Sequence, residues 1–395
     1  MKKIILSAVI ICLLLTSCQH KKEDSPVETA EMRGIWISCY DHISAQDKTE
    51  SEYKAETDEM FQLIKSFGFN TAFVHLRAFS DAFYESEIYP YSVYIAGTQG
   101  ADLSFDPFAV MLESAKANGI SIHGWINPFR ILSDKNTDKI SEKNPAKKLI
   151  ESGSDEVCIL ENGIYYNPSR AENHGRIADG IREIIQKYDI DGIHIDDYFY
   201  PSVSTQVDRV QYSRYTAQGG TLSLEEWRRE NINAFVSALY KAVKAENPDL
   251  IFSVSPGGRL EETKERHFAD CEMWLSEEGY ADLIIPQIYF GFEHGTADFT
   301  SLLVQWGTLR KNKDTDLACG IGAYKCSTFD EYALSGSKEW QEHTDILTRQ
   351  LACIRANTEY SGFVMFSYSD LTRADCTEEM RNLKVSIRGT DNEKD

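Results

Sequence analysis

Short runs of apolar residues recur along this chain from residue 34 onward, and amphipathic stretches separate them. Runs of four to seven residues bounded by turn residues are typical of buried β-strands. The pattern predicts strands at residues 34–39, 71–76, 121–127, 192–196, 251–254, 283–289, 317–321 and 362–367.

The segments between these strands show helical spacing of their apolar positions. We expect helices at residues 57–67, 107–118, 175–187, 224–245, 271–278, 300–311 and 344–357. Eight strands that alternate with helices predict an α/β fold, the (β/α)8 TIM barrel, as a single domain over residues 31–385. A doubly wound open sheet is the alternative, but no Gly-x-Gly-x-x-Gly motif follows the first strand, and the chain has no Walker loop.

Long segments follow the second, third and fourth predicted strands, at residues 77–106, 128–165 and 198–223. In a barrel these segments lie at the C-terminal face, where active sites form. Long loops on that face predict a binding cleft for an extended ligand.

The fourth predicted strand ends in two adjacent carboxylates, Asp196 and Asp197. Because side chains alternate along a strand, His194, Asp196 and Tyr198 share one side, and Asp196 points into the lumen if that side faces inward. Asp197 can join it only if the strand ends there and the backbone turns. The alternative is that both aspartates cap a helix or hold a loop.

Other polar and aromatic residues come at the ends of the predicted strands. Carboxylates, amides, arginines and aromatic rings in one cleft are the usual lining of a sugar site. The candidate substrate-binding residues are Arg77, Trp125, Asn127, Arg130, His194, Tyr198, Ser255, Gln287 and Tyr289. Every residue at a strand end also has a structural alternative. For example, His75 and His123 could be core histidines with satisfied hydrogen bonds, and Trp36 and Trp125 could fill the barrel.

The N-terminus has a basic start, an apolar run and small residues before Cys18. This order predicts a secretory signal over residues 1–17, and it resembles a bacterial lipobox in which Cys18 is lipidated. Residues 18–30 are polar and form a tether. The sequence therefore predicts a lipoprotein anchored in the cell envelope, at the periplasmic face or the cell surface; an ordinary signal peptide is the alternative. Residues 386–395 are expected to form a disordered tail.

Composition narrows the function. The formal charge of −21 argues against a nucleic-acid partner, which needs a basic surface. Nine cysteines are present, two of them ahead of the domain, and the seven in it have irregular spacing without a Cys-x-x-Cys pair. We expect no disulfide framework, mostly buried thiols, no metal site and no cofactor.

Six motifs in order resemble the glycosyl-hydrolase-like 10 family of bacterial secreted and lipoprotein enzymes. They lie at residues 33–36, 123–130, 166–168, 191–201, 253–256 and 286–289. The resemblance implies a (β/α)8 barrel and glycoside hydrolysis, with peptidoglycan glycan strands as the substrate class. One position departs from the family: an aromatic residue such as Trp often follows the last motif, and here it is Phe290.

Glycosidases generally use two carboxyl groups. Asp196 is the expected nucleophile or base, and Asp197, Glu293 and Asp370 are candidates for the acid, with Asp197 favoured. The segment also resembles family 18 chitinases, but Tyr198 stands where those enzymes have their acidic Glu.

Arg77 and Arg130 could bind a substrate carboxylate, such as the lactyl group of muramic acid, or they could pair with Asp81 or Asp106. Two other functions remain open. One is a glycan-binding barrel that has lost its chemistry. The other is a metal-dependent hydrolase, although no spacing gathers three ligands.

Overall fold

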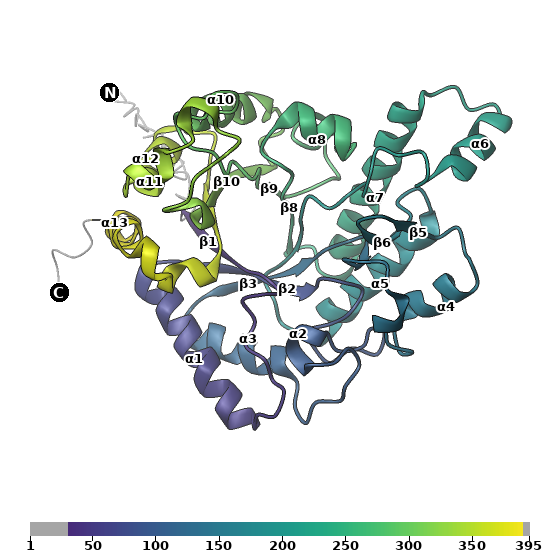
Figure 1. Cartoon of the computed structure of the whole chain (residues 1–395), viewed down its shortest axis with the longest axis horizontal. Helices are drawn as coiled ribbons and strands as arrows, with labels where there is room; N and C mark the ends of the chain where they lie inside the picture. The colour runs from purple at the N-terminus through teal and green to yellow at the C-terminus, as the bar shows by residue number, and fades with distance from the viewer. Residues whose placement is uncertain (1–30, 390–395) are drawn as a thin grey trace, which may run out of the picture. The chain divides into compact units, whose positions relative to one another are not determined.

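The computed structural model describes residues 31–389, which form a closed barrel of parallel strands surrounded by helices (Figure 1). The order around the barrel is β1-β11-β10-β9-β8-β7-β3-β2. The strands are β1 Met32–Ile37, β2 Thr71–Arg77, β3 Ser121–Ile126, β7 Gly192–Ile195, β8 Ile251–Val254, β9 Leu283–Ile284, β10 Asp316–Gly322 and β11 Gly362–Phe366. The predicted TIM barrel is confirmed.

Strand β9 is much shorter than the predicted span 283–289. Pro286 lacks an N–H group and cannot continue a ladder of hydrogen bonds. Beyond it, the strand pairing is reduced to isolated bridges from Gln287 to Gly257 and Gly320.

The predicted helices are all present. They are α1 Glu50–Phe67, α3 Pro107–Ala117, α5 Ala171–Lys187, α7 Leu224–Glu246, α9 Cys271–Trp274, α10 Phe299–Leu309 and α12 Ile346–Ala356. Helix α1 begins seven residues before its predicted start at 57, because Thr49 and Glu52 form a capping box there. Additional helices are α2 Val93–Ala96, α4 Pro145–Glu151, α6 Arg209–Ala217, α8 Leu260–Arg266 and α11 Glu339–Glu342.

A last helix, α13 Thr377–Arg388, packs against α1 and α12. Its side chains Leu383 and Ile387 are buried. The folded domain therefore extends past the boundary at residue 385 that the sequence analysis set. The predicted signal, Cys18 and the tether lie outside the described residues.

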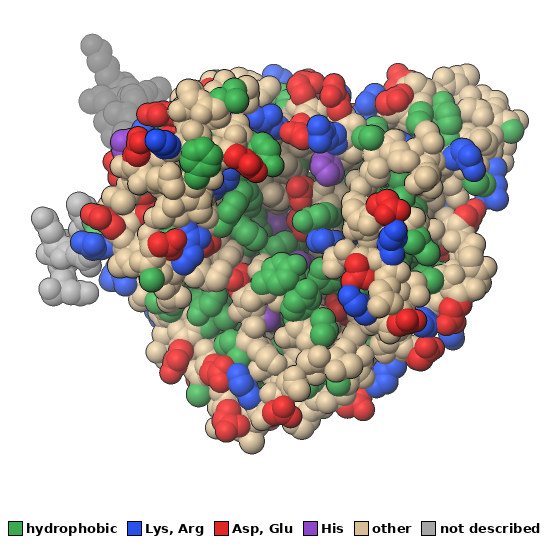
Figure 2. All heavy atoms as spheres, in the orientation of Figure 1, with side chains coloured by type: hydrophobic (Ala, Val, Ile, Leu, Met, Phe, Trp, Pro, Cys, Tyr) green, Lys and Arg blue, Asp and Glu red, His purple; other side chains and the backbone are tan. Residues whose placement is uncertain are grey.

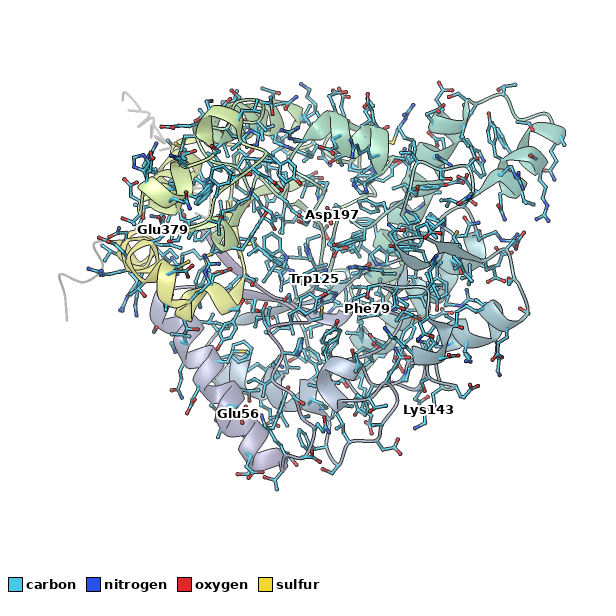
Figure 3. The ribbon with its side chains drawn as sticks, in the orientation of Figure 1. Glu56, Phe79, Trp125, Lys143, Asp197 and Glu379 are labelled. Atoms are coloured by element: carbon cyan, nitrogen blue, oxygen red, sulfur yellow. The ribbon has the colours of Figure 1, made fainter. Side chains whose placement is uncertain are left out.

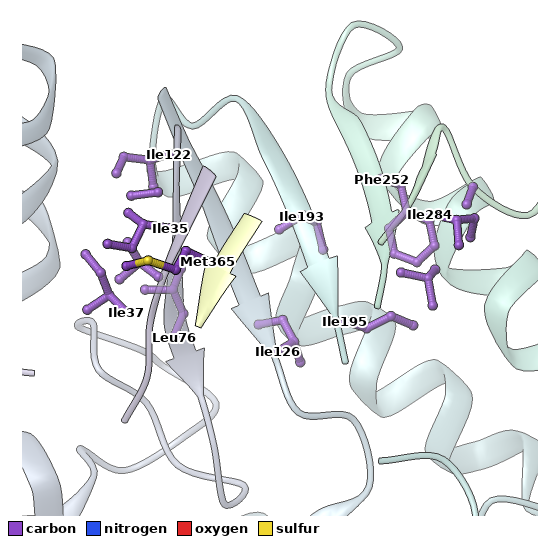
Figure 4. Close-up of a cluster of buried hydrophobic side chains, with 14 of the residues drawn as sticks. Ile35, Ile37, Leu76, Ile122, Ile126, Ile193, Ile195, Phe252, Ile284 and Met365 are labelled. Carbon is purple, nitrogen blue, oxygen red and sulfur yellow. The ribbon is translucent and has the colours of Figure 1, made fainter. Parts of the chain in front are cut away.

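The barrel strands separate two apolar cores. Inside the barrel, the lumen is filled by Trp36, Phe73, Trp125, Leu283, Ile285, Ala318 and Val364. Between the strands and the helices, alternate strand residues such as Ile193 and Ile195 form a larger core (Figure 4). His194 lies between these two isoleucines in the sequence and contacts the lumen residues Trp36, Phe73 and Trp125, so the predicted alternation along this strand is confirmed.

The long segment after β3 contains a small antiparallel sheet that the sequence analysis missed. Its order is β4-β6-β5, with β4 Arg130–Leu132, β5 Val157–Leu160 and β6 Gly163–Tyr166. The apolar runs on either side of Glu161 and Asn162 were the available signal for a hairpin. This sheet fixes the start of β4, where Arg130 lies.

The loop after β7 is held by a buried ion pair between Arg228 on α7 and Asp208. Arg228 donates to both oxygens of this carboxylate, at 2.7 and 2.6 Å, and to the carbonyl of Val203 at 2.9 Å. The rings of Tyr200 and Phe268 lie 5.2 and 5.0 Å from its guanidinium carbon. The pair therefore connects α7 to the segment that follows the two candidate aspartates.

Replacing Arg228 with Met should leave Asp208 buried without its partner. Breaking a buried ion pair on one side typically costs about 3–5 kcal/mol. We expect a loss of this size in the free energy of unfolding, measured by urea denaturation. The control is Arg229→Met, because Arg229 forms no ion pair with any described residue and its replacement should change stability by less than about 0.5 kcal/mol. Equal effects of the two changes would contradict this account.

Candidate active site

A cavity of about 300 Å³ opens at the C-terminal end of the barrel. Figure 2 shows it as a hollow with hydrophobic side chains gathered around it. Its lining comes from every barrel strand except β8, or from the segment directly after each strand. The residues are Trp36, Ser38, Cys39, Tyr40, His75, Ala78, Phe79, Trp125, Asn127, Arg130, Asp196, Asp197, Tyr198, Gln287, Tyr289, Tyr324 and Phe366.

Eight of the predicted site residues meet in this cavity. They are Trp125, Asn127, Arg130, Asp196, Asp197, Tyr198, Gln287 and Tyr289. Trp125 on β3 and Asp197, just after the neighbouring strand β7, lie near the centre of the barrel opening, with Phe79 nearby (Figure 3). The predicted gathering of strand ends is thus present in the structure, whereas the role of each residue stays a prediction.

The two carboxylates reach the cavity because β7 ends at Ile195. Ser255 N donates to the carbonyl of Ile195 at 2.8 Å, and the chain then turns, with Phe199 N donating to the carbonyl of Asp197 at 2.9 Å. This turn breaks the alternation of the strand, so Asp196 and Asp197 both line the cavity. It is the condition that the sequence analysis set for Asp197.

Burial raises the pKa of both carboxyl groups. Asp196 is 3% exposed, and its pKa is well above the usual value because it has lost water and because Asp197 carries a second negative charge beside it. The pKa of the half-buried Asp197 is raised too, mainly by desolvation, and nearby His267 opposes this shift. The pair therefore favours a state that holds one proton, and the deeper burial of Asp196 favours it as the holder. The sequence alone favoured the opposite order, with Asp197 as the acid.

The other two acid candidates lie elsewhere. Glu293 is exposed and does not line the cavity. Asp370 accepts a hydrogen bond from Ser367 N at 3.0 Å and forms an ion pair with Arg373 at 2.5 Å. Of all the residues lining the cavity, only Asp196 and Asp197 carry carboxylates.

His194 lies beneath the cavity and has no free group for a substrate. Trp36 Nε1 donates to its Nε2 at 3.1 Å, so the ring proton is on Nδ1, which donates to Ser253 Oγ at 2.9 Å. Burial holds the pKa of His194 well below its usual value, so the ring stays neutral. Both nitrogens already have protein partners and His194 does not line the cavity, so the structure does not support the prediction that it binds substrate.

Two further predicted binding residues, Ser255 and Arg77, also lie outside the cavity lining and bond to the protein backbone. Ser255 is fully buried, and its hydroxyl donates to the carbonyl of Ile285 at 2.8 Å. Arg77 is 1% exposed, and its Nη1 donates to the carbonyls of Asn127 and Pro128 at 2.6 and 2.9 Å. It therefore holds the backbone at the end of β3, and neither of these residues lines the cavity.

Arg130 contrasts with Arg77. Its guanidinium carbon lies 4.9 Å from the ring centre of Phe79 and 4.6 Å from that of Tyr198, so two aromatic residues flank it. Neither arginine forms an ion pair with Asp81 or Asp106, the alternative that the sequence left open; Asp81 accepts from Gln99 and Asp106 from Tyr188.

Aromatic residues that the sequence analysis did not select complete the cavity. They are Trp36, Tyr40, Phe79, Tyr324 and Phe366. Tyr40, Tyr198 and Tyr324 are 71%, 44% and 40% exposed, so they present ring faces to solvent. Trp36 and Phe366 lie within β1 and β11, whereas Tyr40, Phe79 and Tyr324 lie in the segments after β1, β2 and β10. Phe290, the departure from the family pattern, does not line the cavity.

The remaining chemistry of the domain is limited. Six of its seven cysteines are buried, and all are free thiols in the structure. Within residues 31–389, no three His, Cys, Asp or Glu side chains gather as potential metal ligands. Over the same range, no helix has the length and apolar character that crossing a membrane requires.

A closed parallel barrel with a carboxylate pair in an aromatic cavity at its C-terminal end is the architecture of a glycoside hydrolase. Residues 31–336 match the sequence profile of the family described as glycosyl hydrolase-like 10. The chain belongs to this family and is a glycoside hydrolase, as the resemblance of its motifs implied.

Curated relatives agree with this assignment. Glycosyl hydrolase YngK of Bacillus subtilis (strain 168) is 31% identical over 353 residues, which cover 84% of this chain and 68% of that protein. Glycosyl hydrolase DigH of Escherichia coli (strain K12) is 26% identical over 407 residues, covering 91% of each chain.

Solved structures share the fold at low identity. The PgaB (BpsB) glycoside hydrolase domain from Bordetella bronchiseptica has a TM-score of 0.59 and 12% identity, covering 89% of this chain and 98% of that domain. Alpha-L-fucosidase isoenzyme 2 from Paenibacillus thiaminolyticus has a TM-score of 0.58 and 14% identity, covering 91% of this chain and 50% of that one. Both support the barrel architecture alone.

The raised pKa of Asp196 predicts that this residue destabilises the fold near neutral pH. The unfolded chain ionises near the ordinary value of 3.8, so between that value and the raised one unfolding releases a proton and stability falls as pH rises. We expect Asp196→Asn to increase the free energy of unfolding at pH 7 by about 1 kcal/mol or more. The gain should shrink as pH approaches 3.8, where both states are protonated.

Urea denaturation across this pH range measures the effect, with the exposed Asp249→Asn as the control. A gain that is absent, or that does not depend on pH, would show that Asp196 is not held in a desolvated state.

Proposed function

We propose that this enzyme cleaves glycosidic bonds in the glycan strands of peptidoglycan, with Asp196 and Asp197 as its acid–base pair. The observation that carries the proposal is the position of these two carboxyl groups, which are the only ones lining the cavity. The aromatic residues around them suit a sugar polymer, because sugars stack on ring faces and hydrogen-bond through their hydroxyls. The family resemblance supplies the substrate class.

The chemistry follows from a pair in which one carboxyl group is protonated and the other ionised. A protonated carboxyl group beside an ionised one can protonate the oxygen of the leaving sugar, while its partner assists attack at the anomeric carbon. Burial keeps the acid protonated at pH values where a free carboxyl would be ionised. The deeper position of Asp196 favours it as the acid, with Asp197 as the base or nucleophile.

The N-terminal residues extend the proposal to location. A basic start, an apolar run and Cys18 fit a lipoprotein signal, and polar residues follow it. We infer that lipid on Cys18 anchors the enzyme to a membrane of the cell envelope, within reach of the proposed substrate.

The proposal predicts that Asp196→Asn and Asp197→Asn each lower kcat/KM by roughly a thousandfold or more, because either change removes one of two groups that act together. Sugar release from purified peptidoglycan glycan strands, with and without stem peptides, measures this loss. Glu293→Gln is the matched control, since Glu293 was an acid candidate but lies outside the cavity, and it should retain activity.

Two results would contradict the proposal. Full activity in both aspartate variants would move the chemistry elsewhere. Binding of the strands without cleavage by the unaltered enzyme would favour the alternative of a glycan-binding barrel.

Lipidation is tested separately by Cys18→Ser in the full chain. The measurement is phase partitioning of detergent-solubilised membranes. We expect the unaltered protein to enter the detergent phase and the variant to stay in the aqueous phase, because a serine at position 18 cannot carry the lipid. Equal partitioning of the two proteins would contradict an anchor at Cys18.

A further inference from the structure

One charged group in the cavity has no charged or hydrogen-bonding partner. Arg130 forms no ion pair within 4.0 Å and donates no side-chain hydrogen bond to any residue between 31 and 389. Its Nε is buried without a partner, whereas its two Nη atoms are not among the buried atoms. The end of the guanidinium is therefore open to the cavity.

Three other fully or partly buried arginines each bond to protein groups, although the Nε and Nη2 atoms of Arg77 have no partner. Arg228 chelates Asp208, Arg373 pairs with Asp370 and Asp375, and Arg77 donates to two backbone carbonyls. This contrast matters because a cation held away from bulk water is costly unless something pairs with it. In a chain with a net charge of −21, carboxylates are plentiful, yet none is placed against Arg130.

The rings of Phe79 and Tyr198 explain how Arg130 stays in place. Aromatic faces attract a guanidinium and orient its plane without cancelling its charge. The start of strand β4 fixes its backbone, so the fork is held in position before a ligand arrives.

Asp196 and Asp197 are close enough for Arg130 to lower the pKa of each, but neither reaches ion-pair distance. A direct pair would hold one aspartate ionised and oppose the raised pKa of both groups. The guanidinium of Arg130 therefore stays available for an ion pair with a negatively charged group on the substrate.

We propose that Arg130 binds a carboxylate carried by the glycan, so that this enzyme selects strands with an acidic sugar next to the bond it cleaves. The planar guanidinium matches the two oxygens of a carboxylate, which a lysine would not. This inference rests on the proposed glycan cleavage in the cavity, but not on the polymer's being peptidoglycan. The same carboxylate chemistry occurs in the lactyl ether of muramic acid and in a uronic acid.

The test compares two forms of one substrate. Peptidoglycan glycan strands free of stem peptides are used unchanged or after carbodiimide activation and borohydride reduction of their carboxyl groups to alcohols. We expect Arg130→Met to lower kcat/KM on the unchanged strands by roughly 10- to 100-fold, the range for a lost charged hydrogen bond. On the reduced strands, the unaltered enzyme should fall to the level of the variant, and the variant should lose no further activity.

Two variants serve as comparisons. Arg259→Met removes another arginine stacked on an aromatic ring, Phe290, outside the cavity, and should leave both substrates unaffected. Arg130→Lys keeps the charge without the fork and should retain part of the preference for the acidic form. Thermal denaturation establishes that each variant is folded; Arg130→Met breaks no ion pair, so its Tm should stay within a few degrees.

An equal loss on both substrates would overturn the proposal, because Arg130 would then act on the aspartates and not on the ligand. If the unaltered enzyme cleaves neither form, the peptidoglycan proposal fails. A binding measurement then tests whether Arg130 recognises a sugar carboxylate. Calorimetry with Asp196→Asn then compares chitobiose with disaccharides that contain muramic acid or glucuronic acid. Binding of either acidic disaccharide at least tenfold tighter than chitobiose would support the acidic-sugar subsite, provided that the double variant Asp196→Asn/Arg130→Met loses this difference. The disaccharide that binds more tightly would also identify the source of the carboxylate. Equal binding of all three would overturn the proposal.

Discussion

The site depends on burying two consecutive carboxyl groups in one cavity. Asp196 and Asp197 cannot both ionise there without a large electrostatic cost, so the fold favours keeping one of the two carboxyl groups protonated. Strand β7 ends at Ile195, directly before the pair. The turn that follows places both side chains at the cavity wall. A longer strand would send Asp197 to the opposite side of the sheet and leave one carboxyl group alone.

The layers beneath and around this pair keep it in position. Below it, Trp36, His194 and Ser253 form a buried chain of hydrogen bonds across three strands, with a neutral imidazole at its centre. Beside it, Arg77 fixes the backbone where β3 ends, and beyond it Arg228 and Asp208 fix the loop after β7. Several polar residues near the cavity thus serve the geometry of the site and leave substrate contact to the residues that line it.

The sequence predicted the barrel well because the signals are local. Each strand is an apolar run and each helix has its own periodicity, so eight repeats identify the fold. Helix ends were harder: the start of α1 depends on a capping box at Thr49, and β9 is cut short by Pro286. The antiparallel sheet in the segment after β3 was missed because a short hairpin resembles a loop in composition.

The site was only partly predictable for a different reason. Position at a strand end indicates that a side chain lies near the cavity, but not whether protein groups have already bonded to it. His194, Ser255 and Arg77 fit the pattern of binding residues. Only the three-dimensional arrangement shows that the ring nitrogens of His194, the hydroxyl of Ser255 and Nη1 of Arg77 bond to protein groups and that none of the three residues lines the cavity. Conversely, Tyr40, Phe79 and Tyr324 reach the cavity from turns and loops whose course depends on tertiary packing.

The most direct test of the account is a titration of the two carboxyl groups by carbon-13 NMR, with the resonances assigned from Asp196→Asn and Asp197→Asn. We expect two coupled steps, the upper one well above the ordinary value of 3.8, and we expect the upper step to move down in Asp196 when Asp197 is replaced. Independent titration of both groups near 3.8 would contradict the central claim that the cavity keeps one of the two carboxyl groups protonated.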